Sequence, residues 1–392
     1  MNVFESVGLH ESPFMPVFAP PSVMFVRGKG TELFDIEGRR YLDFLSGIAV
    51  TSLGHAHPVV AEAIATQAHE LLHVSNYFAN PTSTAAAVAV NQLLGEATGE
   101  SGKTFFTNSG AESIECALKL GRKFGGRGRH VVVSAFGSFH GRTLAALAAT
   151  GQPAKHEPFA PMPEGFKHVV WGDVDALEAA VDATVGAVLI EPIQGEGGVI
   201  PAPPGYLTAI RDLCDRTGAL MIVDEIQTGL GRTGEWFGFQ HDGVVPDVVA
   251  LAKALGNGMP VGACWAKDSV AAVFEPGDHG STYSATAIAT SAVNAVIGEM
   301  RRIDAPRLAR ERGAVLAESL AAIRGVSEVR GRGLLLAAEL SDRAAPDVYR
   351  ALLAEGLVVN AVGPTAIRLA PPITVSVDEI HEAVGKIALV LS

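Results

Sequence analysis

The sequence predicts an α/β protein with a large domain on a mostly parallel sheet, followed by a small α+β domain. Between about Tyr41 and Gly298, short apolar runs rich in branched residues alternate with helical segments. The runs are apolar throughout, as expected for strands covered on both faces. After about Ile303 this alternation ends. A chain of 392 residues also exceeds one ordinary core, so about two domains are expected.

These observations place the large domain at residues 51–298 and the small domain at 299–392, with residues 1–50 packing against the small domain. Five strands are predicted in the large domain, at residues 103–107, 130–134, 185–190, 219–224 and 247–251. Helices are predicted between them at 111–123, 205–217 and 285–302. Pro204 and Gly205 mark the start of the second helix and Gly218 its end.

The C-terminal part has a different order of elements. A strand at 329–340 follows a glycine turn, and a helix is predicted at 346–355. Short strands at 357–360 and 366–369 and a last helix at 377–391 complete the small domain. N-terminal strands around 24–26 and 33–35 are expected to pack with it.

Composition excludes several classes of function. Hydrophobic residues make up 48% and charged residues 18%, which is typical of a folded enzyme rather than a disordered chain. The net charge of −12 disfavours nucleic acid and anionic membranes as partners. Three separated cysteines, the absence of a recognisable signal peptide and the lack of a bilayer-length apolar run favour a cytoplasmic protein.

The most informative feature is an acid and a lysine at the ends of successive buried strands. Asp224 ends one apolar run and Lys253 follows the next. Ligands of open parallel sheets bind at the carboxyl ends of the strands. Pyridoxal phosphate (PLP) needs such a pair, because a lysine forms the Schiff base with its aldehyde and a carboxylate pairs with its ring nitrogen. The alternatives are a salt-bridged or helix-capping acid and a surface lysine.

Other strand ends carry groups that such a cofactor would use. Ser109, Gly110 and Ala111 open a helix, where free backbone N–H groups bind phosphate, although an ordinary serine cap has the same pattern. Phe139 could stack on a ring and Arg142 could bind a carboxylate, the alternative being a plain surface loop.

Two further segments carry residues that could bind a charged group or a metal ion. The loop EPIQGEGG, residues 191–198, carries two acids and adjacent glycines, where a carboxylate could neutralise an arginine until substrate displaces it; a solvated turn is the alternative. His55 and His57 lack a nearby acid or cysteine to complete a metal site, so we expect them to pack and predict no metal. Taken together, the five strand ends indicate PLP.

These residues are those of the class III (subgroup II) PLP-dependent aminotransferases, which the chain resembles over nearly its whole length. The resemblance runs from GTELFDIEGR (30–39) and LGHAHP (53–58) to IRLAPP (367–372). Between them lie NSGAE (108–112), FHGRT (139–143), EPIQGEG (191–197), DEIQTG (224–229) and LAKALG (251–256). The resemblance implies PLP-dependent transferase fold type I and a homodimer with active sites shared between subunits.

The resemblance also implies roles for single residues. Lys253 would bond the cofactor and move the proton, and Asp224 would pair with the ring nitrogen. The remaining cofactor contacts would come from Ser109, Gly110, Ala111, Phe139, His140, Glu191 and Gln227, with Thr282 reaching in from the neighbouring subunit. Arg142 and Arg368 resemble the two carboxylate-binding arginines, and Glu196 the acid that masks Arg368.

Within the class, the chain is most similar to the acetylornithine group. This similarity implies that N-acetylornithine and 2-oxoglutarate are converted to N-acetylglutamate semialdehyde and glutamate, a step of arginine biosynthesis. Ile48 occupies a position where ornithine aminotransferases carry a tyrosine, which disfavours unacylated ornithine as the substrate. The alternative donors are succinylornithine, ornithine, 4-aminobutyrate and carrier-bound lysine.

One segment departs from the family pattern. Residues 284–287 read SATA where a Gly-Gly-Asn-Pro stretch is usual, which bears on the geometry around Thr282.

Two remote alternative functions are a PLP-dependent mutase and a PLP-binding regulator without turnover. Arg142, Arg368 and Glu196 together favour a transaminase over the mutase, and intact Lys253 and Asp224 disfavour the regulator.

Overall fold

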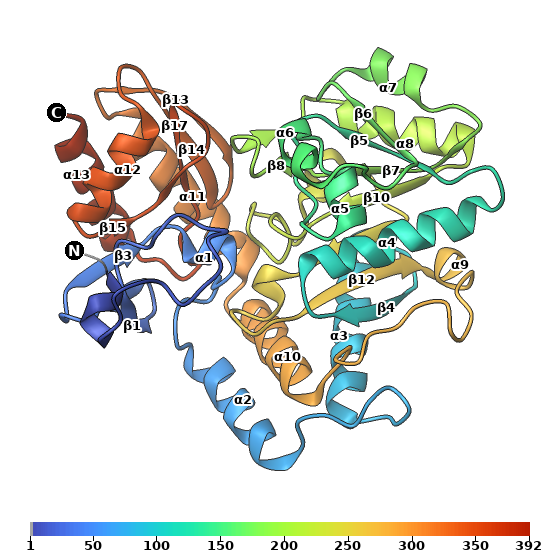
Figure 1. Cartoon of the computed structure of the whole chain (residues 1–392), viewed down its shortest axis with the longest axis horizontal. Coiled ribbons are helices and arrows are strands. Elements are labelled where there is room, and N and C mark those ends of the chain that lie inside the picture. The colour runs from blue at the N-terminus through green and yellow to red at the C-terminus, as the bar shows by residue number, and fades with distance from the viewer. Residues whose placement is uncertain (1–2) are drawn as a thin grey trace.

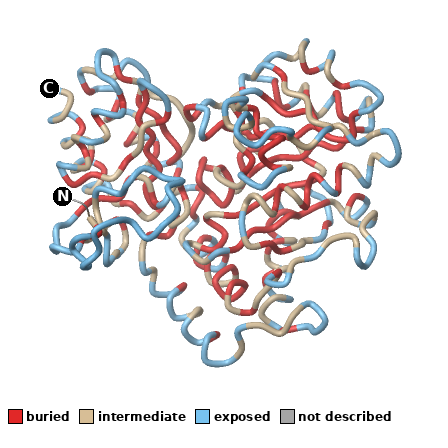
Figure 2. Tube along the Cα trace, viewed as in Figure 1, coloured by how far each residue is buried: buried red, intermediate tan, exposed pale blue. Residues whose placement is uncertain are grey.

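The structure is a computed structural model that describes residues 3–392. Figure 1 shows a large body on the right, built around one sheet, and a smaller body on the left that contains both chain ends. Figure 2 shows that the buried residues concentrate in the central strands of both bodies and in the helices packed on them. The architecture confirms the predicted α/β fold class with a mostly parallel sheet.

The large sheet has seven strands in the order β4-β12-β11-β10-β7-β5-β6. Every neighbouring pair is parallel except those made by β12, which runs antiparallel to both β11 and β4. The five predicted strands are confirmed with small shifts at their ends, and β6 and β12 are additional. The bounds are β4 Gly102–Thr107, β5 Val131–Ala135, β6 Phe166–Val169, β7 Val185–Ile190, β10 Leu220–Asp224, β11 Val248–Leu251 and β12 Gly262–Lys267.

Helices cover both faces of this sheet. Alternate residues of β10 point to opposite faces, so Ile222 joins the apolar cluster under α4 (Gly110–Gly125) while Met221 joins the cluster on the other face. The other helices of this part are α2 Pro58–Glu70, α3 Pro81–Thr98, α5 Leu144–Ala149, α6 Pro153–His156, α7 Val174–Ala180, α8 Tyr206–Thr217, α9 Asp268–Ala271 and α10 Ala287–Arg302. Helix α10 crosses the predicted domain boundary at 298–299, which stays a prediction.

The C-terminal part combines a four-stranded sheet, order β13-β14-β17-β16, with three helices. The prediction of one strand at 329–340 was wrong. Gly333 (φ +54°) turns the chain, so these residues form a hairpin of β13 and β14. The bounds are α11 Ala305–Ala321, β13 Val326–Arg332, β14 Leu335–Leu340, α12 Ala345–Ala354, β16 Asn360–Ala361, β17 Ala366–Leu369 and α13 Val377–Leu391.

The N-terminal strands form a separate sheet that includes a piece of the C-terminal part. The order is β1-β2-β3-β15, and β3 pairs in parallel with β15, with Leu42 opposite Leu357. The predicted strand at 357–360 is therefore two strands, β15 and β16, in different sheets. The bounds are η1 Val3–Val7, β1 Phe25–Lys29, β2 Glu32–Asp35, β3 Arg40–Asp43, α1 Ser46–Ala49 and β15 Leu357–Val358.

A buried arginine ties these parts together. Arg232 has no exposed surface, and its guanidinium donates hydrogen bonds to the Leu334 and Pro371 carbonyls and to Ser52 Oγ. Its acceptors are uncharged, and burial lowers the pKa of Arg232 to about 9. One side chain thus joins the loop after β10, the C-terminal part and the N-terminal segment.

None of the helices in residues 3–392 is both long and apolar enough to cross a bilayer.

Candidate active site

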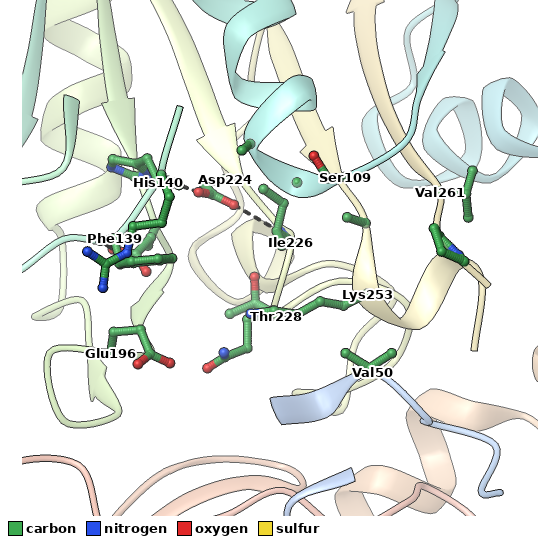
Figure 3. Close-up of a pocket in the computed structure, with 18 of the residues that line it drawn as sticks. Val50, Ser109, Phe139, His140, Glu196, Asp224, Ile226, Thr228, Lys253 and Val261 are labelled. Atoms are coloured by element: carbon green, nitrogen blue, oxygen red, sulfur yellow. Dashed lines mark hydrogen bonds and ion pairs between the residues drawn. The ribbon is translucent and has the colours of Figure 1, made fainter. Parts of the chain in front are cut away.

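A pocket of about 400 Å³ lies at the carboxyl ends of the large-domain strands, as expected for an open α/β sheet. Figure 3 shows side chains from several strand ends converging on it. Its lining combines most of the predicted residues with others: Val50, Asn108, Ser109, Gly110, Ala111, Phe139, His140, Gly141, Arg142, Glu191, Ile193, Glu196, Asp224, Ile226, Gln227, Thr228, Ala252, Lys253, Gly258, Met259, Pro260 and Val261.

One end of the pocket is the N-terminus of α4. Ser109 caps this helix in extended conformation, and its hydroxyl accepts a hydrogen bond from Glu112 N. The first-turn N–H groups of Gly110 and Ala111 lie at the positive end of a 16-residue helix. This end can bind an anion such as a phosphate.

Gly262, which was not among the predicted site residues, allows β12 to pack closely against this loop. A Cβ on Gly262 of β12 would lie 2.4 Å from Ser113 Oγ, 2.5 Å from Thr107 Oγ1 and 2.7 Å from the Ser109 carbonyl oxygen. Only glycine lets β12 pass this closely behind the cap. This role of Gly262 was not predicted, because the residue lies at the start of β12, a strand that the sequence did not indicate.

Asp224 lies deep in the pocket, with 5% of its surface exposed. Its Oδ2 is 2.8 Å from His140 Nδ1, and its Oδ1 accepts from Ile226 N at 3.0 Å (Figure 3). Because an ionised carboxylate only accepts hydrogen bonds, His140 Nδ1 donates this one. His140 therefore orients the acid, which can pair with a positive group in the pocket.

The neighbouring acid has a different task. Glu225 does not line the pocket, and its carboxylate accepts from the backbone N–H groups of Gly238 and Phe239, both at 2.9 Å. Burial raises the pKa of Glu225 to about 7. Glu225 thus fixes the following loop, and Asp224 is the acid that faces a ligand.

Lys253 follows β11 and points into the pocket (Figure 3). Its backbone is left-handed (φ +45°), a strained conformation for a residue with a side chain. Burial, together with the charge of Arg368, lowers the pKa of Lys253 to about 8, although nearby carboxylates oppose this shift. A lysine with this pKa has a substantial neutral, nucleophilic fraction near neutral pH.

Glu191 contacts the backbone of Phe139, and it forms no ion pair with an arginine among residues 3–392. Its Oε2 accepts from Phe139 N at 3.2 Å. Burial, and then the charge of Asp224, raise the pKa of Glu191 well above its usual value. Burial and the neighbouring Asp224 thus disfavour a second negative charge at this point of the pocket.

Arg368 and Glu196 form an ion pair across the pocket, 2.6 Å apart. Arg368 is fully buried on β17, whereas the Glu196 side chain is a third exposed on a large-domain loop. Although burial opposes it, the charge of Arg368 holds the pKa of Glu196 below its usual value. Arg368 also contacts Gln227 Oε1 at 3.4 Å, and its Nη2 is buried without a partner among the described residues. The pair can open to let Arg368 bind another carboxylate.

Three predicted residues do not line the pocket: Arg368, whose partner Glu196 does line it, Ile48 and Thr282. Ile48 lies in α1, a left-handed turn in which residues 46–49 have φ between +53° and +68°, and Val50 lines the pocket in its place. Thr282 is exposed in the loop before α10 and does not line the pocket of its own chain, although the hydroxyl of its neighbour Ser281 accepts a hydrogen bond from Asn108, which does. Its predicted role concerns a neighbouring subunit and stays a prediction.

Residues 284–287, which lack the glycines expected from the resemblance, still include one left-handed backbone conformation. Ala285 takes the left-handed conformation itself, with φ +57°. The buried Ser284 hydroxyl donates to the Phe106 carbonyl at 2.6 Å, which ties the loop to β4 just before the pocket. The loop is therefore anchored without glycine.

Known proteins share this arrangement. A family model described as "Aminotransferase class-III" matches residues 16–391. The chain is 46% identical over 381 residues to an acetylornithine aminotransferase of Corynebacterium efficiens, covering 96% of this chain and 94% of that one.

Solved structures agree with the sequence relatives. An N-acetylornithine aminotransferase from Stenotrophomonas maltophilia superimposes with a TM-score of 0.82 at 33% identity, covering 95% of this chain and 96% of that one. An ornithine aminotransferase from Toxoplasma gondii, with partial occupancy of PLP at its active site, gives a TM-score of 0.90 at 32% identity, covering 97% and 92%.

Proposed function

Since the chain belongs to the class-III aminotransferases, we propose that it transfers the terminal amine of N-acetylornithine to 2-oxoglutarate. The products are N-acetylglutamate semialdehyde and glutamate, which places the reaction in arginine biosynthesis. The observation that carries this proposal is the Arg368–Glu196 pair at 2.6 Å beside Lys253 and Asp224. A closed pair suits a donor with a single carboxylate, and an open pair suits a dicarboxylate acceptor.

The pocket residues fit PLP as the cofactor. Backbone groups of Ser109, Gly110 and Ala111 would hold its phosphate, and Asp224, oriented by His140, would pair with its ring nitrogen. Phe139 would cover the ring, with Gln227 and Glu191 as further polar contacts. When bound, PLP supplies an aldehyde that takes up the amine and a ring that delocalises electrons.

Lys253 would carry out the proton transfers. With a pKa of about 8, its Nζ can take a proton from the donor carbon that bears the amine, and in the second half of the cycle it can deliver a proton to the carbon of 2-oxoglutarate that receives the amine. No carboxylate among residues 3–392 forms an ion pair with Lys253, so the amine is free to move between these tasks.

The two substrates would use the arginines in turn. The far carboxylate of the donor would approach Arg142, which is exposed at the pocket mouth, while Glu196 masks Arg368. The acceptor 2-oxoglutarate carries a second carboxylate near its keto group, which would displace Glu196 and bind Arg368. The same site thereby accepts two differently charged molecules in alternation.

We further propose a cytoplasmic homodimer in which Thr282 completes the phosphate site of the neighbour. Large side chains beside this loop are exposed in the single chain, including Tyr77 at 93%, Phe78 at 70% and Tyr283 at 63%. Such a concentration of exposed aromatic residues is typical of a protein interface. The three buried free cysteines are compatible with a reducing compartment.

The test compares amine donors side by side with 2-oxoglutarate as acceptor. N-acetylornithine should give a higher kcat/KM than ornithine or 4-aminobutyrate, and the Lys253→Ala protein should lose turnover with all three. A preference for ornithine or 4-aminobutyrate would replace the proposed substrate, and full activity of Lys253→Ala would refute the proposed role of the lysine.

A further inference from the structure

A lysine outside the predicted site lies close to Phe139, which lines the pocket. Lys155 is half-buried on the short helix α6, and its Nζ is 6.0 Å from the centre of the Phe139 ring. The guanidinium of Arg142 lies 5.6 Å from the centre of the same ring. The Lys155 amine donates a hydrogen bond to the side-chain oxygen of Gln152, which directs it.

Lys155 and Arg142 are two cations that both lie near the Phe139 ring. In the part of the chain that the structure describes, neither forms an ion pair, and the nearby Glu196 is engaged by Arg368. Burial, and then the positive charge of Arg142, lower the pKa of Lys155, whereas Glu196 raises it. An anion placed between the two cations would relieve this repulsion.

A surface lysine would normally turn into the solvent to avoid such a neighbour. Lys155 instead remains half-buried and bonded to Gln152, near Phe139 and its neighbour Arg142, both of which line the pocket. Both cations lie about one ring away from Phe139, so a negatively charged ligand group near this ring would be attracted by both of them.

We propose that Lys155 is a specificity-determining residue that binds, together with Arg142, the carboxylate at the donor end farthest from the reacting amine. This inference rests on the proposed function and adds a second cation to the recognition of the donor. It predicts selection for donors with a negative charge at that end over neutral analogues of the same shape.

The test uses the cofactor-loaded enzyme and the variants Lys155→Met, Lys155→Arg and Lys103→Met. Lys103 lies at the opposite end of β4, and its loss changes the net charge equally. In Lys155→Met we expect a roughly tenfold higher KM for N-acetylornithine with kcat within about twofold, because a partly buried charge pair is lost. Lys155→Arg should restore most of the affinity, and Lys103→Met should behave like the wild type.

Binding is measured separately from turnover by calorimetry with N-acetylnorvaline, which keeps the far carboxylate but lacks the reacting amine. Its Kd should rise roughly tenfold in Lys155→Met, while the carboxamide of N-acetylornithine, tested as a neutral donor, should be used equally by wild type and variant. An unchanged Kd, or a fall in kcat at constant KM, would overturn the role of Lys155.

The outcome is distinguishable from failure of the proposed function. If the wild type prefers 4-aminobutyrate, the proposed donor is wrong, but 4-aminobutyrate also carries a far carboxylate and its KM then tests Lys155 directly. An unchanged KM for that donor in Lys155→Met would overturn the role of Lys155. A matched melting temperature and cofactor absorbance in all variants ensure that the comparison concerns folded enzyme.

Discussion

Replacing Lys253 with methionine should make the cofactor-free protein more stable and should abolish the activity of the cofactor-loaded enzyme. The pKa of Lys253 is about 8 in the folded protein and 10.5 for an ordinary lysine. This gap, at about 1.36 kcal/mol per pH unit, amounts to about 3 kcal/mol of unfavourable charge burial. Because Lys253 borders an open pocket, screening by water reduces the expected gain to about 2 kcal/mol.

The difference in the free energy of unfolding between the wild type and Lys253→Met should depend on pH. The unfolded chain keeps the lysine proton up to pH 10.5, whereas the folded protein releases it above pH 8, so the wild type gains stability as the pH rises through this window. The stability advantage of Lys253→Met should therefore be full below pH 8 and nearly vanish by about pH 10.5.

Urea unfolding at pH 7, 8.5 and 10 measures this difference, with Lys103→Met as the control. The Lys103 side chain is 74% exposed, so its loss should change the free energy of unfolding by less than about 0.5 kcal/mol. A Lys253→Met protein no more stable than the wild type at pH 7, or an advantage that does not shrink with pH, would refute the reasoning.

Three further perturbations test the site. Asp224→Asn should retain the phosphate anchor but lower kcat at least about 100-fold, because the neutral amide cannot stabilise a positive ring nitrogen; steady-state rates and cofactor absorbance check this. Glu196→Ala should leave Arg368 unmasked, lowering the KM for 2-oxoglutarate several-fold and raising that for N-acetylornithine; unchanged KM values would count against the switch. Gly262→Ala should cost about 1–3 kcal/mol in urea unfolding and weaken cofactor retention, whereas Gly298→Ala, in open space on a helix, should be neutral or stabilising by up to about 1 kcal/mol.

Sequence reasoning found most clearly the strands that read as unbroken apolar runs. β7 and β10 are buried at every residue, so their apolar runs were unambiguous. β6 is an edge strand that carries Lys167 and His168 and lacks such a run. β12 is nearly all buried, yet only ten residues separate it from β11, too few for a parallel crossover. That spacing could have predicted its antiparallel direction.

The site residues that could be predicted are the reactive or polar side chains that follow directly after a strand. Asp224, Lys253 and Ser109 each come at a strand end, so the sheet alone brings them together. Ile48 depends instead on a left-handed turn, whose four positive φ values are imposed by surrounding contacts and leave no local signature. The pairing of Arg368 with Glu196 joins residues 172 positions apart, and the resemblance rather than the local pattern indicated it.

The pairing of β3 with β15 has a consequence for the order in which the protein can mature. Leu42 and Asp43 leave the ribosome long before their partners Leu357 and Val358, which lie 315 positions further along the chain. Until these partners are synthesised, one edge of β3 remains unpaired and open to association with other chains. Closing so long a stretch of chain is slow, so we expect the N-terminal sheet to be completed after the domain between the two strands has formed.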